Sequence, residues 1–142
     1  MKRYANIVLQ NLVFNINGFD NVLFNNIENL VNSSIDVVYC AILNKIPKNL
    51  VEPTISELCN KIRPGGEIVF ILADVKTICK LFSEGSMSND EFFNFMSNTQ
   101  NLFFLPEFED IFDKHLGKDF HILNTELQNN NLIISLQRIN HD

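Results

Sequence analysis

Two patterns of apolar residues alternate in the middle of the chain. Near-continuous apolar runs at residues 35–41 and 68–72 predict strands that are covered on both faces, as in a parallel sheet. Between them, apolar residues recur at steps of three and four over residues 55–62, which predicts an amphipathic helix that starts near Pro53. Strand, helix and strand in this order form a βαβ unit, so we expect an α/β domain with a mostly parallel sheet.

The two ends of this helix carry recognisable signals. Thr54 and Glu57 have the spacing of a capping box, in which each side chain satisfies a backbone donor of the first turn. Pro64 cannot continue the helix. We expect Gly65 and Gly66 to supply the positive φ angles of a sharp reversal into the next strand.

Turn residues divide the rest of the chain into further elements. We expect strands at 5–13 and 19–24, helices after Asp74, from Ser88 or Asn89 and from Pro106, and a closing antiparallel hairpin of strands 120–127 and 132–139. The whole chain, residues 1–142, is then a single domain with about six strands.

The composition of the chain argues against nucleic-acid binding, membrane insertion and secretion. The net charge is −6 and no cluster of basic residues could follow a phosphate backbone, which disfavours nucleic-acid binding. No apolar run approaches the ~20 residues of a membrane span, and the polar residues that follow Lys2 and Arg3 lead us to expect no secretory signal there. Cys40, Cys59 and Cys79 lie far apart in apolar segments, so we interpret them as buried thiols of a cytoplasmic protein.

Several short motifs occur in an order that is informative together. Residues 34–39 read Ser-Ile-Asp-Val-Val-Tyr, residues 62–68 read Ile-Arg-Pro-Gly-Gly-Glu-Ile, and residues 18–23 read Gly-Phe-Asp-Asn-Val-Leu. With the closing hairpin, these motifs resemble the class I S-adenosylmethionine-dependent methyltransferases, in particular the compact kind often found among surface-polysaccharide genes. The resemblance implies a reduced Rossmann-like methyltransferase sheet with a C-terminal antiparallel hairpin.

The resemblance also implies a methyl donor, S-adenosylmethionine, and a small-molecule acceptor, such as a saccharide, that offers a hydroxyl or carboxyl group. It places the candidate cofactor-binding residues at Gln10 and Asn11, at Asp20 or Glu28 as replacement ligands of the ribose, at Asn26 and Ile27 beside the adenine, and at Tyr39, Cys40 and Ala41 under the sulfonium. These residues follow the first strand, flank the second, or end the strand at 35–41. The alternative is that they are ordinary turn and strand-end residues.

The sequence departs from the family where the donor should bind. The family places a Gly-x-Gly turn after the first strand, because only glycine lets the backbone approach the ligand closely, but Leu9 and Gln10 stand there. Leu23 replaces the acid that would bind the ribose, and residues 25–34 leave no room for a third strand with its helix. A second hypothesis is therefore a degenerate, non-catalytic relative that acts as an interaction subunit or homodimer. It predicts that side chains such as Leu12 and Phe14 fill the donor space.

Three further features have both a functional and an ordinary interpretation. Asp74, at the end of a central strand, is a candidate general base or the cap of the next helix. His115 and His121 match no established ligand spacing, so we expect no metal site. The phenylalanines between residues 92 and 104 either pack in the core or form a self-association surface.

Overall fold

The computed structural model describes residues 2–10, 13–73, 75–97, 99, 105–115, 117–128 and 131–140, with the backbone alone at 105–108 and 115. In chain order the elements are β1 (Tyr4–Val8), β2 (Asp20–Leu23), the 3-10 helix η1 (Phe24–Asn29), β3 (Ile35–Cys40), the 3-10 helix η2 (Leu43–Lys45), α1 (Lys48–Lys61), β4 (Ile62–Leu72), α2 (Val75–Ser83), α3 (Asn89–Ser97), α4 (Leu105–His115), β5 (Phe120–Gln128) and β6 (Asn131–Arg138).

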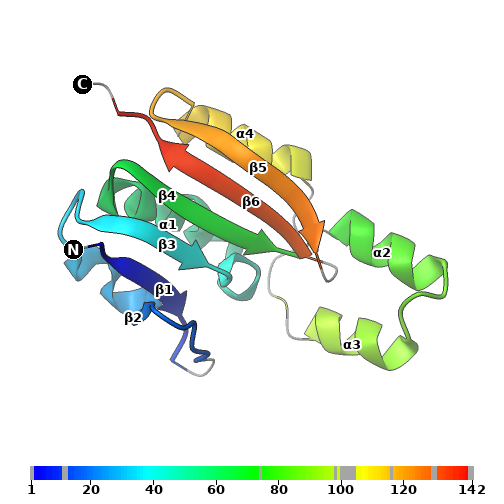
Figure 1. Cartoon of the computed structure of the whole chain (residues 1–142). Coiled ribbons are helices and arrows are strands. Elements are labelled where there is room, and N and C mark those ends of the chain that lie inside the picture. Colours follow the sequence, from blue (N-terminus) through cyan, green and yellow to red (C-terminus); the bar gives the residue numbers. More distant parts are fainter. Residues whose placement is uncertain are drawn as a thin grey trace.

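Within these residues the strands form one six-stranded sheet in the order β2-β1-β3-β4-β6-β5 (Figure 1). The first four strands are parallel to their neighbours. The last two form an antiparallel hairpin, and β6 pairs with β4. This confirms the predicted reduced α/β sheet with its C-terminal hairpin. The segment between β2 and β3 holds only η1 and a turn, as its length implied.

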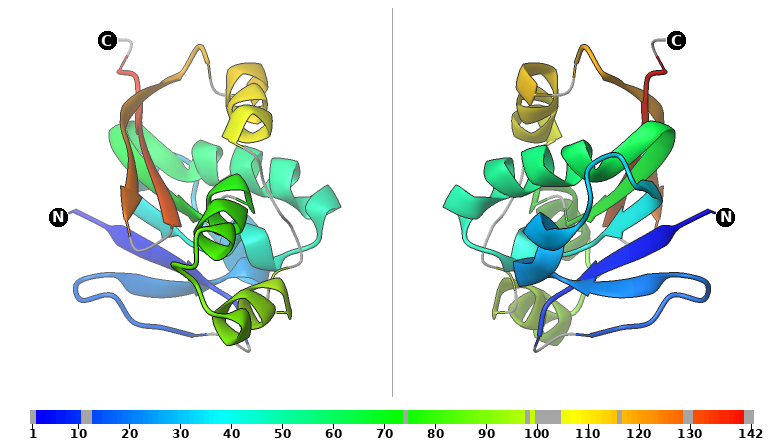
Figure 2. Two further views of the ribbon diagram at one scale, coloured as in Figure 1. Left: turned by 90° about the vertical axis from the view of Figure 1, so that its right-hand side faces the viewer. Right: turned by 90° about the vertical axis from the view of Figure 1, so that its left-hand side faces the viewer.

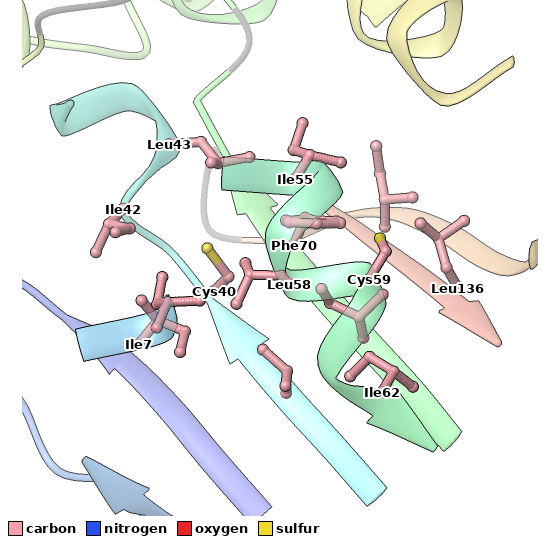
Figure 3. Packing of buried hydrophobic residues seen from close by; sticks show 14 of the residues in the cluster. Ile7, Cys40, Ile42, Leu43, Ile55, Leu58, Cys59, Ile62, Phe70 and Leu136 are labelled. Atoms are coloured by element: carbon pink, nitrogen blue, oxygen red, sulfur yellow. The ribbon is translucent and has the colours of Figure 1, made fainter. Parts of the chain in front are cut away.

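The helices that cover the sheet lie on one of its faces. Figure 2 shows α1 and α4 on the same side, and no helix in the described residues covers the opposite side. The core fills the space beneath α1, where Leu58 and Ile55 pack with Phe70 of β4 (Figure 3). Each such fully buried aliphatic side chain contributes about 1.5–3 kcal/mol. On the other face Val69 remains half-buried, so the expectation of cover on both faces holds for one face only.

Helix α1 starts earlier than predicted, and the expected capping box is wrong. Pro47 occupies the N-cap with φ −57°, and Pro53 lies inside the helix. Asn49, whose carbonyl would have accepted the missing N–H of Pro53, is exposed, so water can satisfy it. The hydroxyl of Thr54 donates to the carbonyl of Leu50 at 2.6 Å instead of capping the helix.

The two glycines at the start of β4 have different roles, which corrects the prediction of two positive φ angles. Gly65 has φ +83°, whereas Gly66 is not among the residues with positive φ. A Cβ on Gly66 would lie 2.8 Å from the carbonyl oxygen of Asp36 and 2.9 Å from that of Arg63. Gly66 is therefore needed for the close approach of β4 to β3, at the point where their pairing register shifts.

Helices α2 and α3 form a hairpin beyond the carboxyl ends of the parallel strands (Figure 1). Gly85, with φ +78°, ends the turn after α2 as predicted. Ser88 caps α3: its hydroxyl accepts from the N–H of Glu91 at 3.1 Å, and the Glu91 carboxylate accepts from the N–H of Ser88 at 3.4 Å. None of the helices described has the length and apolarity needed to cross a lipid bilayer.

Candidate functional site

The carboxyl ends of β1, β3 and β4 lie at the same edge of the sheet, because these strands are parallel. Ligands of open α/β sheets bind at this edge. The chain leaves β1 through Leu9, whose side chain packs against the core, and Gln10, which is exposed. The described part of the connection, residues 13–19, contains no helix before β2 begins. A donor-binding glycine turn is followed by a helix. Residues 13–19 form no such helix.

Aromatic side chains of this connection instead lie over β1 and β3 on the helix-free face of the sheet. Phe19 stacks on Tyr4 with ring centroids 5.2 Å apart and meets Tyr39 edge-on at 6.4 Å. Phe14 meets Tyr39 edge-on, also at 6.4 Å. Burial by these neighbours raises the pKa of the Tyr39 phenol. These four rings form a packed cluster over β1 and β3, which we call the aromatic cover.

An asparagine network fixes the aromatic cover in place. The fully buried amide of Asn6 on β1 donates to the carbonyl of Phe14 at 2.9 Å and to the side-chain oxygen of Asn21 at 3.1 Å. Asn21 in turn donates to the side chain of Asn15 at 2.7 Å. The side-chain oxygen of Asn6 has no hydrogen-bond partner among the described residues. Tertiary hydrogen bonds, and not a glycine-rich loop, therefore determine the path of this connection.

The candidate cofactor-binding residues do not gather around one cavity. Asp20 begins β2 and pairs with Ala5, so it lies at the amino end of the strands, away from Gln10. Asn26 is exposed on η1, whereas Ile27 is buried in the core. Asn11 lies outside the described residues.

The two candidates within β3 point to its opposite faces. Tyr39 belongs to the aromatic cover, while Cys40 is fully buried beneath α1 (Figure 3). Burial raises the pKa of the Cys40 thiol to about 12, although a hydrogen bond with the backbone of Ile42 opposes the shift. Cys40 is therefore a core residue without nucleophilic character.

A cavity of about 500 Å³ opens at the carboxyl ends of β3 and β4. Its walls come from the first connection, both strand ends, α3 and the start of β6; the lining residues are Phe14, Ala41, Asn44, Lys45, Ile71, Ala73, Asn94, Phe95, Thr99 and Asn131. A volume of this size fits a small molecule. Of the candidate cofactor-binding residues that are described, Ala41 lines it, and so does Phe14, which was expected to fill the donor space. Asp74, the candidate base or helix cap, lies outside the described residues.

Asn44 holds the floor of this cavity and was missed by the sequence analysis. Its buried side chain accepts from the N–H of Ala73 at 2.8 Å and donates to the carbonyl of Ala73 at 3.3 Å. It thus ties the segment after β3 to the end of β4. A polar residue just after a buried parallel strand was the available signal, because such positions face the ligand edge of the sheet.

A second, shallower cavity of about 330 Å³ lies between η1 and α1 and is lined by Phe24, Asn25, Ile27, Glu28, Leu50, Pro53, Thr54 and Glu57. Of the candidate residues, Ile27 and Glu28 line it. No group of three or more acidic, cysteine or histidine side chains in the described residues could hold a metal ion. His121 is exposed on β5, and the side chain of His115 is not among those described.

The strand order and its antiparallel hairpin are shared with solved methyltransferases. A methyltransferase from Archaeoglobus fulgidus, described as dependent on S-adenosylmethionine, superposes with a TM-score of 0.62 and 9% identity over 96% of this chain and 86% of its own. The chain has the fold of the class I S-adenosylmethionine-dependent methyltransferases. No protein-family model and no curated protein matches the sequence.

Other solved methyltransferases are larger than this chain. An O-methyltransferase family protein from Burkholderia thailandensis has a TM-score of 0.59 and 14% identity over 86% of this chain, which spans only 37% of that protein. A 1,6-didemethyltoxoflavin-N1-methyltransferase from the same organism, solved with its substrate and S-adenosylhomocysteine, has a TM-score of 0.54 and 10% identity over 80% of this chain and 48% of its own. These likenesses establish the methyltransferase fold and leave the chemistry to the residues of this chain.

Proposed function

We propose that this protein is a non-catalytic member of the methyltransferase fold that acts as an interaction subunit. The observation that carries the proposal is the connection from β1 to β2, which builds the aromatic cover in place of a glycine turn. A turn that binds a nucleoside donor exposes backbone amides at the end of β1. Here the side chain of Leu9 packs against the core at that position.

The groups that would hold the ribose and adenine do not fit the donor either. Leu23, at the carboxyl end of β2, offers no carboxylate, and Asp20 lies at the other end of the strand. Glu28 on η1, the other candidate ligand of the ribose, lines the shallower cavity beside α1 and not the cavity at the carboxyl ends of β3 and β4. A ribose needs acceptors for its hydroxyl groups at the carboxyl end of β2, and neither Leu23 nor Asp20 supplies one there.

Thermal unfolding in the presence of S-adenosylhomocysteine tests this proposal. A ligand that binds the native state at a concentration of 100 times its Kd adds about 2.7 kcal/mol to the stability, which raises the Tm of a domain of this size by about 8 °C. We expect no shift, as for methionine or adenosine used as controls. A rise that saturates with S-adenosylhomocysteine would overturn the proposal.

The cavity at the ends of β3 and β4 favours a second candidate function, methyl transfer to a small or saccharide acceptor. Phe14 and Phe95 provide apolar walls, while Asn94 and Asn131 provide amides that could bind hydroxyl groups. This function requires the donor, so labelled methyl transfer from S-adenosylmethionine to a panel of sugars and hydroxy acids separates it from the first. Incorporation that is lost in a Phe95→Glu variant would favour the enzyme.

A further inference from the structure

We propose that two copies of this chain pair edge to edge through β5, so that the sheet of one copy continues into the other. The pairing rests on the interaction role proposed above and gives that role its partner. β5 is one edge of the sheet (Figure 1), and among the described residues only β6 pairs with it. It is 9 residues long, whereas β2 at the other edge has 4. A long open edge presents unpaired backbone groups that another strand can bond.

The side chains of β5 leave this edge uncovered. All of its residues except Phe120 are exposed. Ile122, Leu123 and Leu127 are 53%, 45% and 60% exposed, although each is large and apolar. Edge strands are commonly protected by lysine, proline or a bulge. β5 contains no lysine and no proline, so its bulge decides which strand can pair with it.

The pairing of β5 with β6 determines which backbone groups are open. The N–H of Ile139 donates to the carbonyl of Asp119 at 2.6 Å, so the odd-numbered residues of β6 direct their backbone groups toward β5. The residues opposite them on β5 bond β6 in return. Open backbone groups belong to the residues that lie opposite the even-numbered residues of β6, which are Phe120, Ile122, Thr125 and Leu127.

The bulge at Leu123 divides β5 into two halves whose alternation differs. Ile122 lies opposite Leu136 on the core side of the sheet, and Asn124 lies opposite Ser135 on the helix-free side. Residues two apart in a regular strand share a face, so the alternation reverses between these two positions. An antiparallel partner without a bulge would match the faces of one half of β5 only.

A second β5 has the same bulge and restores the match. A two-fold axis perpendicular to the sheet, passing between residues 123 and 124, sets the two strands antiparallel with their bulges at the axis. Ile122 then lies opposite Thr125, and Phe120 lies opposite Leu127. These are the residues with open backbone groups, and each pair can exchange two hydrogen bonds. The helices α1 and α4 of both copies lie on the same side of the continued sheet.

The same register brings complementary groups together on the helix-free side. His121 lies opposite Glu126 of the second copy, and the axis repeats the pair. Both side chains are exposed, and neither forms an ion pair within the described part of the chain. An imidazole can donate a hydrogen bond to a carboxylate and attracts it more strongly when protonated. β5 is therefore complementary to itself, as a closed dimer requires.

The α2–α3 hairpin is the strongest competing surface. No residue of α3 is buried, so its phenylalanines do not belong to the core, and Phe93 is 67% exposed. No complementary pattern in the described residues indicates what covers this surface. Phe93 therefore supplies a control position, because α3 lies apart from β5 (Figure 1).

Sedimentation velocity of the full chain, from low to high micromolar concentration, tests the proposal. We expect a concentration-dependent dimer for the natural chain and for Phe93→Glu. Thr125→Pro removes an open backbone N–H on each side of the axis and should raise the dimer dissociation constant at least about tenfold. Circular dichroism should show that both variants remain folded. A natural chain that stays monomeric, or a dimer kept in Thr125→Pro and lost in Phe93→Glu, would overturn the proposal.

Two sets of exposed side-chain variants test the register. His121→Glu sets two carboxylates opposite each other and should weaken the dimer about threefold to tenfold, and adding Glu126→Lys should restore most of the loss. In a Cys79→Ser background, His121→Cys with Glu126→Cys should form an intermolecular disulfide, because opposite residues of antiparallel strands bring their Cβ atoms within reach. His121→Cys alone should form none, since the two copies of residue 121 lie about 16 Å apart along the paired strands. Equal cross-linking of the single and double variants would overturn the pairing.

The outcomes for the dimer are separate from donor binding. A monomer that ignores S-adenosylhomocysteine rejects only the dimer. A dimer that binds S-adenosylhomocysteine rejects only the non-catalytic role.

Discussion

The most quantitative prediction concerns the two adjacent glycines at the start of β4. They look alike in the sequence, but the structure gives each a different reason to be glycine. Gly65 has φ +83°, and a Cβ added to it would have no heavy atom within 4 Å. Gly66 lies against backbone, with carbonyl oxygens 2.8 and 2.9 Å from the position of a Cβ. Substitution by alanine therefore separates a conformational cost from a steric one.

The expected free energies follow from these distances. In Gly65→Ala the cost is that of a left-handed conformation, about 1–2 kcal/mol, reduced by about 0.5 kcal/mol because alanine restricts the unfolded chain. In Gly66→Ala the methyl group would sit well inside the ~3.5 Å of an ordinary contact. The carbonyl of Asp36 belongs to β3, so relief requires a shift of the β3–β4 pairing. We expect a loss of about 3 kcal/mol for Gly66→Ala, against about 1 kcal/mol for Gly65→Ala.

Urea unfolding followed by far-ultraviolet circular dichroism measures both changes. The two variants are matched in chemistry and differ by one position, so the difference between their unfolding free energies is more reliable than either value. A loss for Gly65→Ala equal to or greater than that for Gly66→Ala would refute the assignment of roles. It would mean that the φ angle, and not the approach of β4 to β3, sets the requirement for glycine.

Two further predictions concern buried polar groups and thiols. Asn44→Ala should lower the unfolding free energy by about 2–3 kcal/mol in the same urea experiment, because it removes both hydrogen bonds to Ala73; a loss below about 0.5 kcal/mol would contradict this role. At pH 8 a disulfide reagent should titrate only Cys79 in the native protein, because burial raises the pKa of Cys40 and Cys59 to about 12 and leaves about one thiolate in ten thousand. Equal reactivity of all three thiols in the native protein would contradict the prediction that Cys79 alone reacts.

Local patterns in the sequence were sufficient to predict most of the fold. The apolar runs at residues 35–41 and 68–72 correspond to β3 and the end of β4, because buried parallel strands have few polar positions. The hairpin of β5 and β6 was predicted within one or two residues at each end. Ser88 and Gly85 also mark the observed helix ends, since a cap depends on a few adjacent residues.

The errors lie where tertiary contacts decide the local structure. Thr54 matches a capping box in sequence, but the helix begins at Lys48, and the hydroxyl of Thr54 donates to the carbonyl of Leu50 inside the helix. The role of Gly66 depends on the position of Asp36 on the neighbouring strand, which no local pattern reveals. Cys40 and Cys59 are buried as predicted, but the prediction was wrong for Cys79, which is exposed.

The candidate site was harder to predict than the fold for the same reason. Phe14 was expected to fill the donor space, and it lies in the aromatic cover and on the wall of the larger cavity. The position of Asp20 depends on the register between β1 and β2, which the sequence does not specify. Asn44 acquires its role only when η2 meets the end of β4.

Calorimetric titration of the full chain with S-adenosylhomocysteine tests the proposed non-catalytic role most directly. We predict no saturable heat up to millimolar ligand, since neither the turn after β1 nor the end of β2 offers the donor its usual contacts. Saturable binding of one ligand per chain in the micromolar range would contradict this role. The donor site would then survive without its glycines, and Gln10 and Asn26 would be the first residues to replace.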